Sequence, residues 1–193
     1  DWGRFPLGEM VKKGWIHFDG SINSAREKAE ALLSEFFTEA NLREVPKAVL
    51  YRKTVRSDSP VNEYALTAWY AKARIEQGKM QVEKKHNKED LSGCFFDDLR
   101  KLSFLDKGPL LAREFLLKSG IKMVVVPHFK GTRLDGAVFR NERGEPVIAL
   151  SLRFDRLDNF WFTLFHELSH LRLHLSSPED RFFDDLGTTG VIS

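Results

Sequence analysis

The sequence contains a single cysteine, Cys94, among its 193 residues. One cysteine cannot form an internal disulfide, so the chain does not depend on an oxidising compartment to fold. Two phenylalanines follow Cys94, and this apolar setting predicts a buried structural thiol rather than a nucleophile. The cysteine content therefore favours a reducing environment, such as the cytoplasm.

Long apolar runs and a strong charge of either sign are also missing. No apolar stretch approaches the roughly 20 residues that span a bilayer, and no secretory signal peptide is recognisable. The formal net charge is only +2, and the densest basic cluster, residues 84–88, is too short to form a nucleic-acid-binding stripe. We therefore expect a cytoplasmic chain that binds neither a membrane nor, by its own surface, a nucleic acid.

Apolar residues make up 42% of the chain and include sixteen phenylalanines, enough for one sizeable core with a helical annex. Helical periodicity dominates the first part of the sequence. Helices are predicted from a capping box at Ser24 to about Asn41, from Ser59-Pro60 to Gly78, and over 95–102 and 109–119, with Gly120 ending the last in a left-handed conformation.

The pattern changes after residue 120. Short β-rich runs at 121–126, 136–140 and 146–151 predict strands, and the turn at 141–144 predicts that the last two form a hairpin. A sheet of about three strands would then precede one more helix. The fold class is therefore predicted as α+β, with residues 1–20 as a linker from a missing N-terminal domain, 21–105 as a helical region and 106–193 as the α+β domain.

That last helix carries an H-E-x-x-H motif at residues 166–170. Residues four apart lie on one face of an α-helix, so the imidazoles of His166 and His170 can bind a single metal ion. Glu167 lies beside them, where a carboxylate can reach a metal-bound water without ligating the metal. This arrangement is typical of zinc peptidases, in which the glutamate acts as general base. The alternative is a surface stripe of histidines with a solvated glutamate.

The rest of the helix favours the metal site over that alternative. Most of its residues are apolar, which predicts burial, and a buried polar stripe needs partners that a metal would supply. The stripe comprises Thr163, His166, Glu167, His170 and His174. His174 lies about 12 Å along the helix from His166, too far for both to reach one ion, so it is expected to be a neighbour rather than a ligand.

Residues 111–174 resemble the ImmA/IrrE family of metallo-endopeptidase domains in the segments GIKMVVVP, LDGAVF, PVIALS and FTLFHELSHLRLH. The opening FPLGEMVKKGWI and the helices that follow are similar to the region after the helix-turn-helix domain of XRE-type regulators and HigA-like antitoxins. The resemblance implies a zincin-like domain with zinc on His166 and His170 and Glu167 as general base. It also implies a protein or peptide substrate, such as a repressor or toxin. DNA would be bound only through a helix-turn-helix domain outside this chain, and a homodimer is possible.

Two further expectations follow from the resemblance. The strand at 136–139 would hold the substrate backbone by strand addition if it formed the sheet edge, the alternative being ordinary sheet packing. The third zinc ligand of the family is an acidic residue on a later helix, and no such helix precedes Ser193. Glu179, Asp180, Asp184 and Asp185 are available, but acidic clusters beside a proline more often mark a helix start or a solvated loop. We therefore expect the third ligand to lie outside this stretch or to be lost.

Two classes of function remain open on this basis. One is a zinc endopeptidase that cleaves a regulatory protein. The other is a catalytically silent regulatory or antitoxin module that keeps the peptidase fold and acts by sensing, dimerisation or toxin neutralisation. A small-molecule-binding domain with a vestigial motif is a third possibility.

Overall fold

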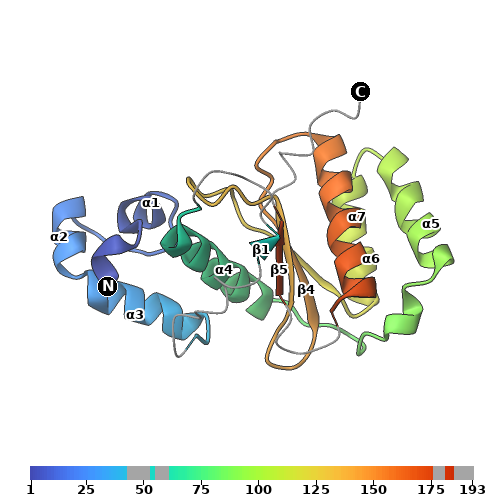
Figure 1. The fold of residues 1–193 in the computed structure, drawn as a ribbon, viewed down its shortest axis with the longest axis horizontal. Coiled ribbons are helices and arrows are strands. Elements are labelled where there is room, and N and C mark those ends of the chain that lie inside the picture. Colours follow the sequence, from blue (N-terminus) through green and yellow to red (C-terminus); the bar gives the residue numbers. More distant parts are fainter. Residues whose placement is uncertain (43–52, 55–60, 176–180, 185–193) are drawn as a thin grey trace.

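The structure, a computed structural model, describes residues 1–42, 53–54, 61–175 and 181–184. Within these residues the chain forms one mixed β-sheet with helices packed on both of its faces (Figure 1). The strands lie in the order β1 (Lys53–Thr54), β5 (Arg181–Asp184), β3 (Gly136–Arg140), β4 (Pro146–Leu150) and β2 (Lys122–Val125). The α+β class is confirmed.

The strands β2, β3 and β4 match the three runs predicted from the sequence. The strands β3 and β4 pair antiparallel as the expected hairpin, and β2 lies parallel to β4 on its other side. The expectation of about three strands was too low, because β5 pairs antiparallel with β3 and β1 pairs parallel with β5. Both additional strands are very short, two and four residues, which left no periodic signal in the sequence.

The helix α4 (Glu63–Gly78) covers one face of the sheet. Asn62 begins it, since its side-chain oxygen accepts hydrogen bonds from the backbone amides of Tyr64 and Ala65, both at 3.1 Å. The predicted start at Ser59-Pro60 lies outside the described residues, and the predicted end at Gly78 is confirmed. Small side chains at Ala65, Ala68, Ala71 and Ala73 are fully buried, which allows α4 to approach its neighbours closely.

Outside α4 lie η1 (Trp2–Arg4), α1 (Leu7–Lys12), α2 (Ile22–Glu27) and α3 (Ala29–Glu39). The single helix predicted from the capping box at Ser24 is in fact two helices that meet at Lys28. The cap is Ser21, whose hydroxyl accepts a hydrogen bond from the amide of Ser24 at 3.2 Å. Residues 1–20, expected to be a linker, bury Phe5, Met10 and Trp15 in the same core as α4. This segment therefore packs as part of the domain.

The opposite face of the sheet is covered by α7 (Leu157–Leu173) and by α6 (Gly108–Lys118), which contacts β2. Farther from the sheet lie η4 (Leu102–Phe104) and α5 (Gly93–Lys101), and η3 (Lys88–Asp90) precedes α5. Gly120 follows α6 with a φ of +76°, as predicted for a left-handed helix end. The prediction of a buried thiol was wrong, because Cys94 is exposed. It lies in the first turn of α5, whose buried side chains are Phe95 and Leu99.

The sheet divides the apolar core into two clusters, because alternate residues of each strand point to opposite faces. In β3, Ala137 and Phe139 face the α4 side, whereas Val138 faces the α7 side.

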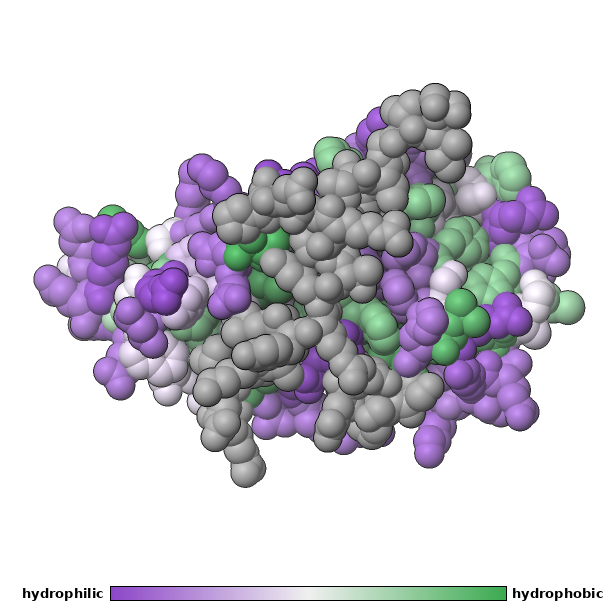
Figure 2. Space-filling view, in the orientation of Figure 1, coloured by the Kyte–Doolittle hydropathy of each residue, from purple (hydrophilic) through white to green (hydrophobic). Residues whose placement is uncertain are grey.

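Hydrophilic residues dominate the surface over α1–α3, while hydrophobic residues are more frequent over α5 and α7 (Figure 2). None of the helices in the described part of the chain is long and apolar enough to cross a membrane.

Candidate metal centre

The motif helix α7 packs against the central strands β3 and β4. Its buried leucines, Leu164, Leu168 and Leu171, belong to the core cluster on this side of the sheet and are at most 1% exposed. Because these residues anchor one side of the helix, the polar stripe with His166 and His170 lies beside the sheet instead of on the outer surface. The apolar pattern around the motif thus places the histidines next to β5.

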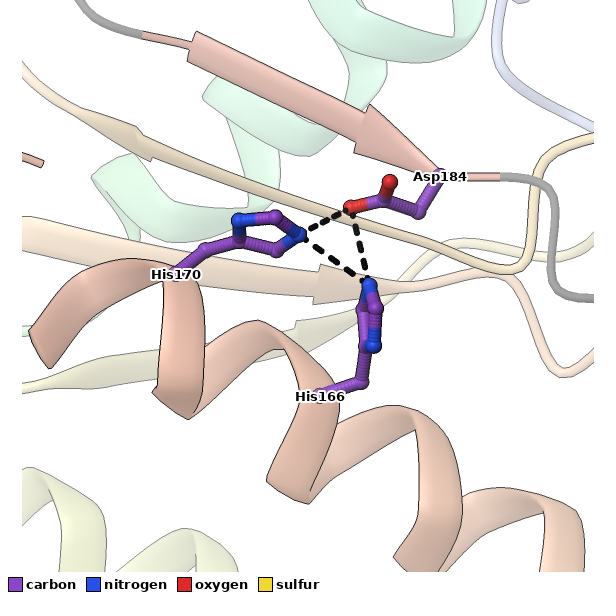
Figure 3. Close-up of side chains that lie close together, drawn as sticks. All are labelled: His166, His170 and Asp184. Atoms are coloured by element: carbon purple, nitrogen blue, oxygen red, sulfur yellow. Dashed lines mark hydrogen bonds and ion pairs between the residues drawn. The ribbon is translucent and has the colours of Figure 1, made fainter. Parts of the chain in front are cut away.

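The two histidines and Asp184 converge on one point, as Figure 3 shows. The Nε2 atoms of His166 and His170 lie 3.1 Å apart. Asp184 Oδ2 is 3.4 Å from Nε2 of His166 and 2.9 Å from Nε2 of His170. Three potential ligand atoms, one from each residue, are therefore within contact distance of one another.

Asp184 is one of the four acidic candidates of the sequence analysis, which favoured a third ligand outside this stretch or a lost one. It ends β5, and the antiparallel register places it opposite Gly136 of β3. Side chains of directly paired residues point to the same face of a sheet, and here that face carries α7. The other acidic candidates, Glu179, Asp180 and Asp185, lie outside the described residues. The segment Arg181–Asp184 has only four residues and no polar–apolar alternation, so no signal in the sequence indicated this strand.

Asp184 is only 5% exposed, so its carboxylate needs compensation. Burial by itself would raise the pKa of this group. The contacts with His166 and His170 outweigh that effect and lower the pKa of Asp184 to about 2. Asp184 is thus an anion at any physiological pH, as a metal ligand must be.

Glu167 is wholly buried, with 0% of its surface exposed, which excludes the alternative of a solvated glutamate. Its carboxyl lies against Gly136, where a Cβ atom would come within 2.3 Å of Oε1. Neither oxygen has a hydrogen-bond partner among the described residues. Burial raises the pKa of Glu167 well above its ordinary value, and the nearby carboxyls of Asp184 and Asp135 raise it further. Since Gly136 pairs with Asp184, the Glu167 carboxyl lies beside the histidine–aspartate group.

The donor set suits a divalent metal of the zinc type. Two imidazole nitrogens and one carboxylate are a common ligand set of catalytic zinc, which keeps its fourth position open. When zinc–ligand bonds of about 2 Å meet at tetrahedral angles, neighbouring ligand atoms lie about 3.3 Å apart. The observed separations of 2.9, 3.1 and 3.4 Å lie around that value. The spacing of the three ligand atoms therefore fits such an ion.

Two further expectations concern the surroundings of this group. His174 follows α7 and, as predicted, is not part of the group of three; its ring centroid lies 5.6 Å from that of His170. Of the two possibilities for residues 136–139, strand addition required β3 to be an edge strand, but β3 pairs with β4 on one side and with β5 on the other. A fully paired central strand has no free backbone groups to offer a substrate, so residues 136–139 serve sheet packing.

Comparisons of the chain with protein-family models, with curated proteins and with solved structures each found no match.

Proposed function

We propose that this chain is a zincin-like, zinc-dependent endopeptidase domain that hydrolyses a peptide bond in a protein substrate. The observation that carries the proposal is the convergence of His166, His170 and Asp184 within 3.4 Å of one another, with the Glu167 carboxyl beside them. Two histidines and a carboxylate around one point, next to a fourth ionisable group that is not needed as a ligand, match the requirements of metal-assisted hydrolysis.

His166, His170 and Asp184 would hold the zinc. When bound, zinc would supply a Lewis acid that activates water and polarises the amide carbonyl. Glu167 would be a carboxylate with a cation beside it, since nearby positive charge favours the ionised form. It would accept a proton from the attacking water at a carboxylate oxygen and deliver that proton to the leaving amide nitrogen. The water oxygen joins the carbonyl carbon, the C–N bond breaks, and an acid and an amine result.

The substrate would be a regulatory protein, such as a repressor or a toxin, as the resemblance to peptidase domains of transcriptional regulators suggests. In that setting DNA would be bound by a separate helix-turn-helix domain. The chain would contribute the proteolytic or regulatory activity, and a homodimeric arrangement is compatible with such regulators.

A catalytically silent regulatory or antitoxin module is the second candidate, and one observation favours it. Glu167 has no exposed surface and packs directly against Gly136, which suits a structural carboxyl at least as well as a proton carrier. Such a module would bind the metal for stability or sensing and would recognise its partner without cleaving it.

The experiment that separates the candidates combines zinc analysis with hydrolysis of an internally quenched peptide library. We expect near-stoichiometric zinc in the reconstituted protein and in Glu167→Gln, and none in His166→Ala. Cleavage should fall about 100-fold or more in Glu167→Gln, the usual loss when a general base is removed. His174→Ala, one turn beyond His170 but outside the ligand group, is the matched control and should keep both zinc and cleavage.

Each outcome has a separate meaning. Equal zinc content in His166→Ala and the parent would overturn the metal site. Cleavage that persists undiminished in Glu167→Gln would overturn the role of Glu167. Bound zinc without cleavage of any library member or candidate regulatory protein would favour the silent module.

A further inference from the structure

A phenylalanine of β5 lies flat against one of the two motif histidines. The ring centroids of Phe182 and His170 are 4.8 Å apart and the ring planes differ by only 11°. Phe182 is partly buried in the core cluster on the α7 side of the sheet. Its ring also approaches His174, at 5.9 Å between centroids. The stacked pair therefore links the strand β5 to the last turn of α7.

His170 lacks the usual device that fixes a metal-binding histidine. Such residues ordinarily donate a hydrogen bond from the ring nitrogen that does not bind the metal, which sets the orientation and tautomer of the ring. Nδ1 of His170 is buried and has no hydrogen-bond partner among the described residues. The orientation of this imidazole must therefore come from packing.

The strand β5 places the stacking ring and the acidic ligand on the same face. Phe182 and Asp184 are two residues apart, so their side chains point the same way, and they pair with Val138 and Gly136 of β3. Phe183 between them points to the other face of the sheet, where its ring lies 5.7 Å from that of Tyr70 on α4. One strand of four residues thus contributes both a ligand and a contact to a second ligand.

We infer that Phe182 is a positioning residue of the metal site. Its ring holds the imidazole of His170 in the orientation in which Nε2 faces His166 and Asp184, the arrangement visible in Figure 3. The inference rests on the metal site of the proposed function but not on peptidase activity. A flat aromatic ring restricts rotation of the imidazole about χ2, whereas an aliphatic side chain at this position would leave the ring free to turn.

The test measures zinc affinity by competition with a chromophoric chelator. Phe182→Leu should bind zinc about 10-fold more weakly, the lower end of the loss seen when an orienting contact of a metal ligand is removed. Phe182→Tyr keeps the flat ring and should restore the affinity. Phe183→Leu is the matched control: it shortens the neighbouring aromatic on the opposite face, so it should lower the melting temperature but leave the zinc affinity unchanged.

Unchanged affinity in Phe182→Leu, or an equal loss in Phe183→Leu, would overturn the inference. A second measurement on the parent protein covers the case in which Phe182→Leu fails to fold. In the NMR spectrum of the zinc-free protein, the ring protons of His170 should be shifted upfield by the Phe182 ring. His17, whose side chain is 92% exposed, provides the reference, and a His170 signal at the position of His17 would count against the stack.

The two proposals fail in different ways. A parent protein that binds no zinc would overturn both. A parent that binds zinc in a Phe182-dependent manner but cleaves no substrate would leave the positioning role intact and remove only the endopeptidase activity.

Discussion

Each end of the β3–β4 hairpin is associated with a buried polar cluster, and the two clusters differ in how their hydrogen bonds are satisfied. The first, here called the hairpin cluster, comprises Gln77, Lys122, Asn141 and Glu145. Lys122 Nζ donates to Gln77 Oε1 at 3.3 Å and pairs with Glu145 Oε2 at 2.8 Å. Asn141 Nδ2 donates to the same two oxygens, at 2.9 and 2.7 Å. Each of the four side chains therefore has a hydrogen-bond or ion-pair partner within the cluster.

The second cluster, the metal cluster, comprises His166, Glu167, His170 and Asp184. Here both oxygens of Glu167 and Nδ1 of His170 lack a hydrogen-bond partner among the described residues. A buried polar group without a partner costs roughly 1–3 kcal/mol of stability. The hairpin cluster therefore supports the fold, while the metal cluster weakens it unless something else is bound. This difference between the two clusters supports the proposal of a metal site at α7 and β5.

The largest effect should follow from breaking the hairpin cluster. Lys122→Met leaves Glu145 without its cation in a largely buried position, and removing one partner of a buried pair costs about 3–5 kcal/mol. We expect a loss in the free energy of unfolding of about 3 kcal/mol in denaturant titrations. Lys101→Met is the control. It breaks a surface ion pair between Lys101 and Asp98, which is also 2.8 Å long, and should leave stability unchanged. Equal effects would show that the hairpin cluster is no more than a surface network.

A smaller loss is expected from Gly136→Ala, at the contact between β3 and the metal cluster. The added Cβ would meet Oε1 of Glu167 at 2.3 Å and Cγ2 of Thr163 at 2.8 Å, so α7 and β3 would have to separate. Overpacking of this kind typically costs about 1–3 kcal/mol. Combining Gly136→Ala with Glu167→Ala should cost less than the sum of the two single variants. Gly93→Ala, where a Cβ would meet nothing within 4 Å, is the control. If the stability losses of the two single variants simply add up in the double variant, the Glu167 carboxyl does not contact Gly136.

The direct test of the comparison replaces one side chain in each cluster by methionine. In the zinc-free protein, Glu167→Met removes a buried carboxyl without partners and should raise the free energy of unfolding by about 1–2 kcal/mol. Gln77→Met removes an acceptor that Lys122 and Asn141 both use and should lower it by a similar amount. Thermal and urea unfolding of the two variants checks this. Effects of the same sign would contradict the functional interpretation of the metal cluster.

Much of the α7 side could be predicted because its signals are local. The H-E-x-x-H spacing places His166 and His170 one turn apart wherever the helix lies, and the alternation and turn residues of β3 and β4 specify their hairpin. The ends of α6 and α4 followed from Gly120 and Gly78 for the same reason. Each of these features depends on residues within about one turn or one strand of each other.

The features that could not be predicted depend on contacts distant in sequence. Asp184 joins the site only through the pairing of β5 with β3, some 45 residues away. The same pairing makes β3 a central strand, and this decides between the two roles considered for residues 136–139 in favour of sheet packing. Sequence patterns thus indicated two of the three residues of the candidate metal centre, and the sheet topology added Asp184.

The smallest expected effect is the acid dependence of the hairpin cluster. Burial alone would raise the pKa of Glu145, but Lys122 and Asn141 outweigh it and lower the pKa below its ordinary value. A carboxyl with a lowered pKa stabilises the fold above its unfolded-state pKa, about 4.3, and this contribution disappears as the pH falls through the folded-state pKa. Glu145→Gln should therefore be about 1 kcal/mol less stable than the parent at pH 7 and nearly equal to it in strong acid. Urea titrations of both proteins from pH 7 downward measure the difference in their free energies of unfolding. Because the other carboxyls titrate alike in the two proteins, the pH dependence of this difference comes from Glu145. A constant gap across the whole range would mean that Lys122 is held by Gln77 instead of by the charge of Glu145.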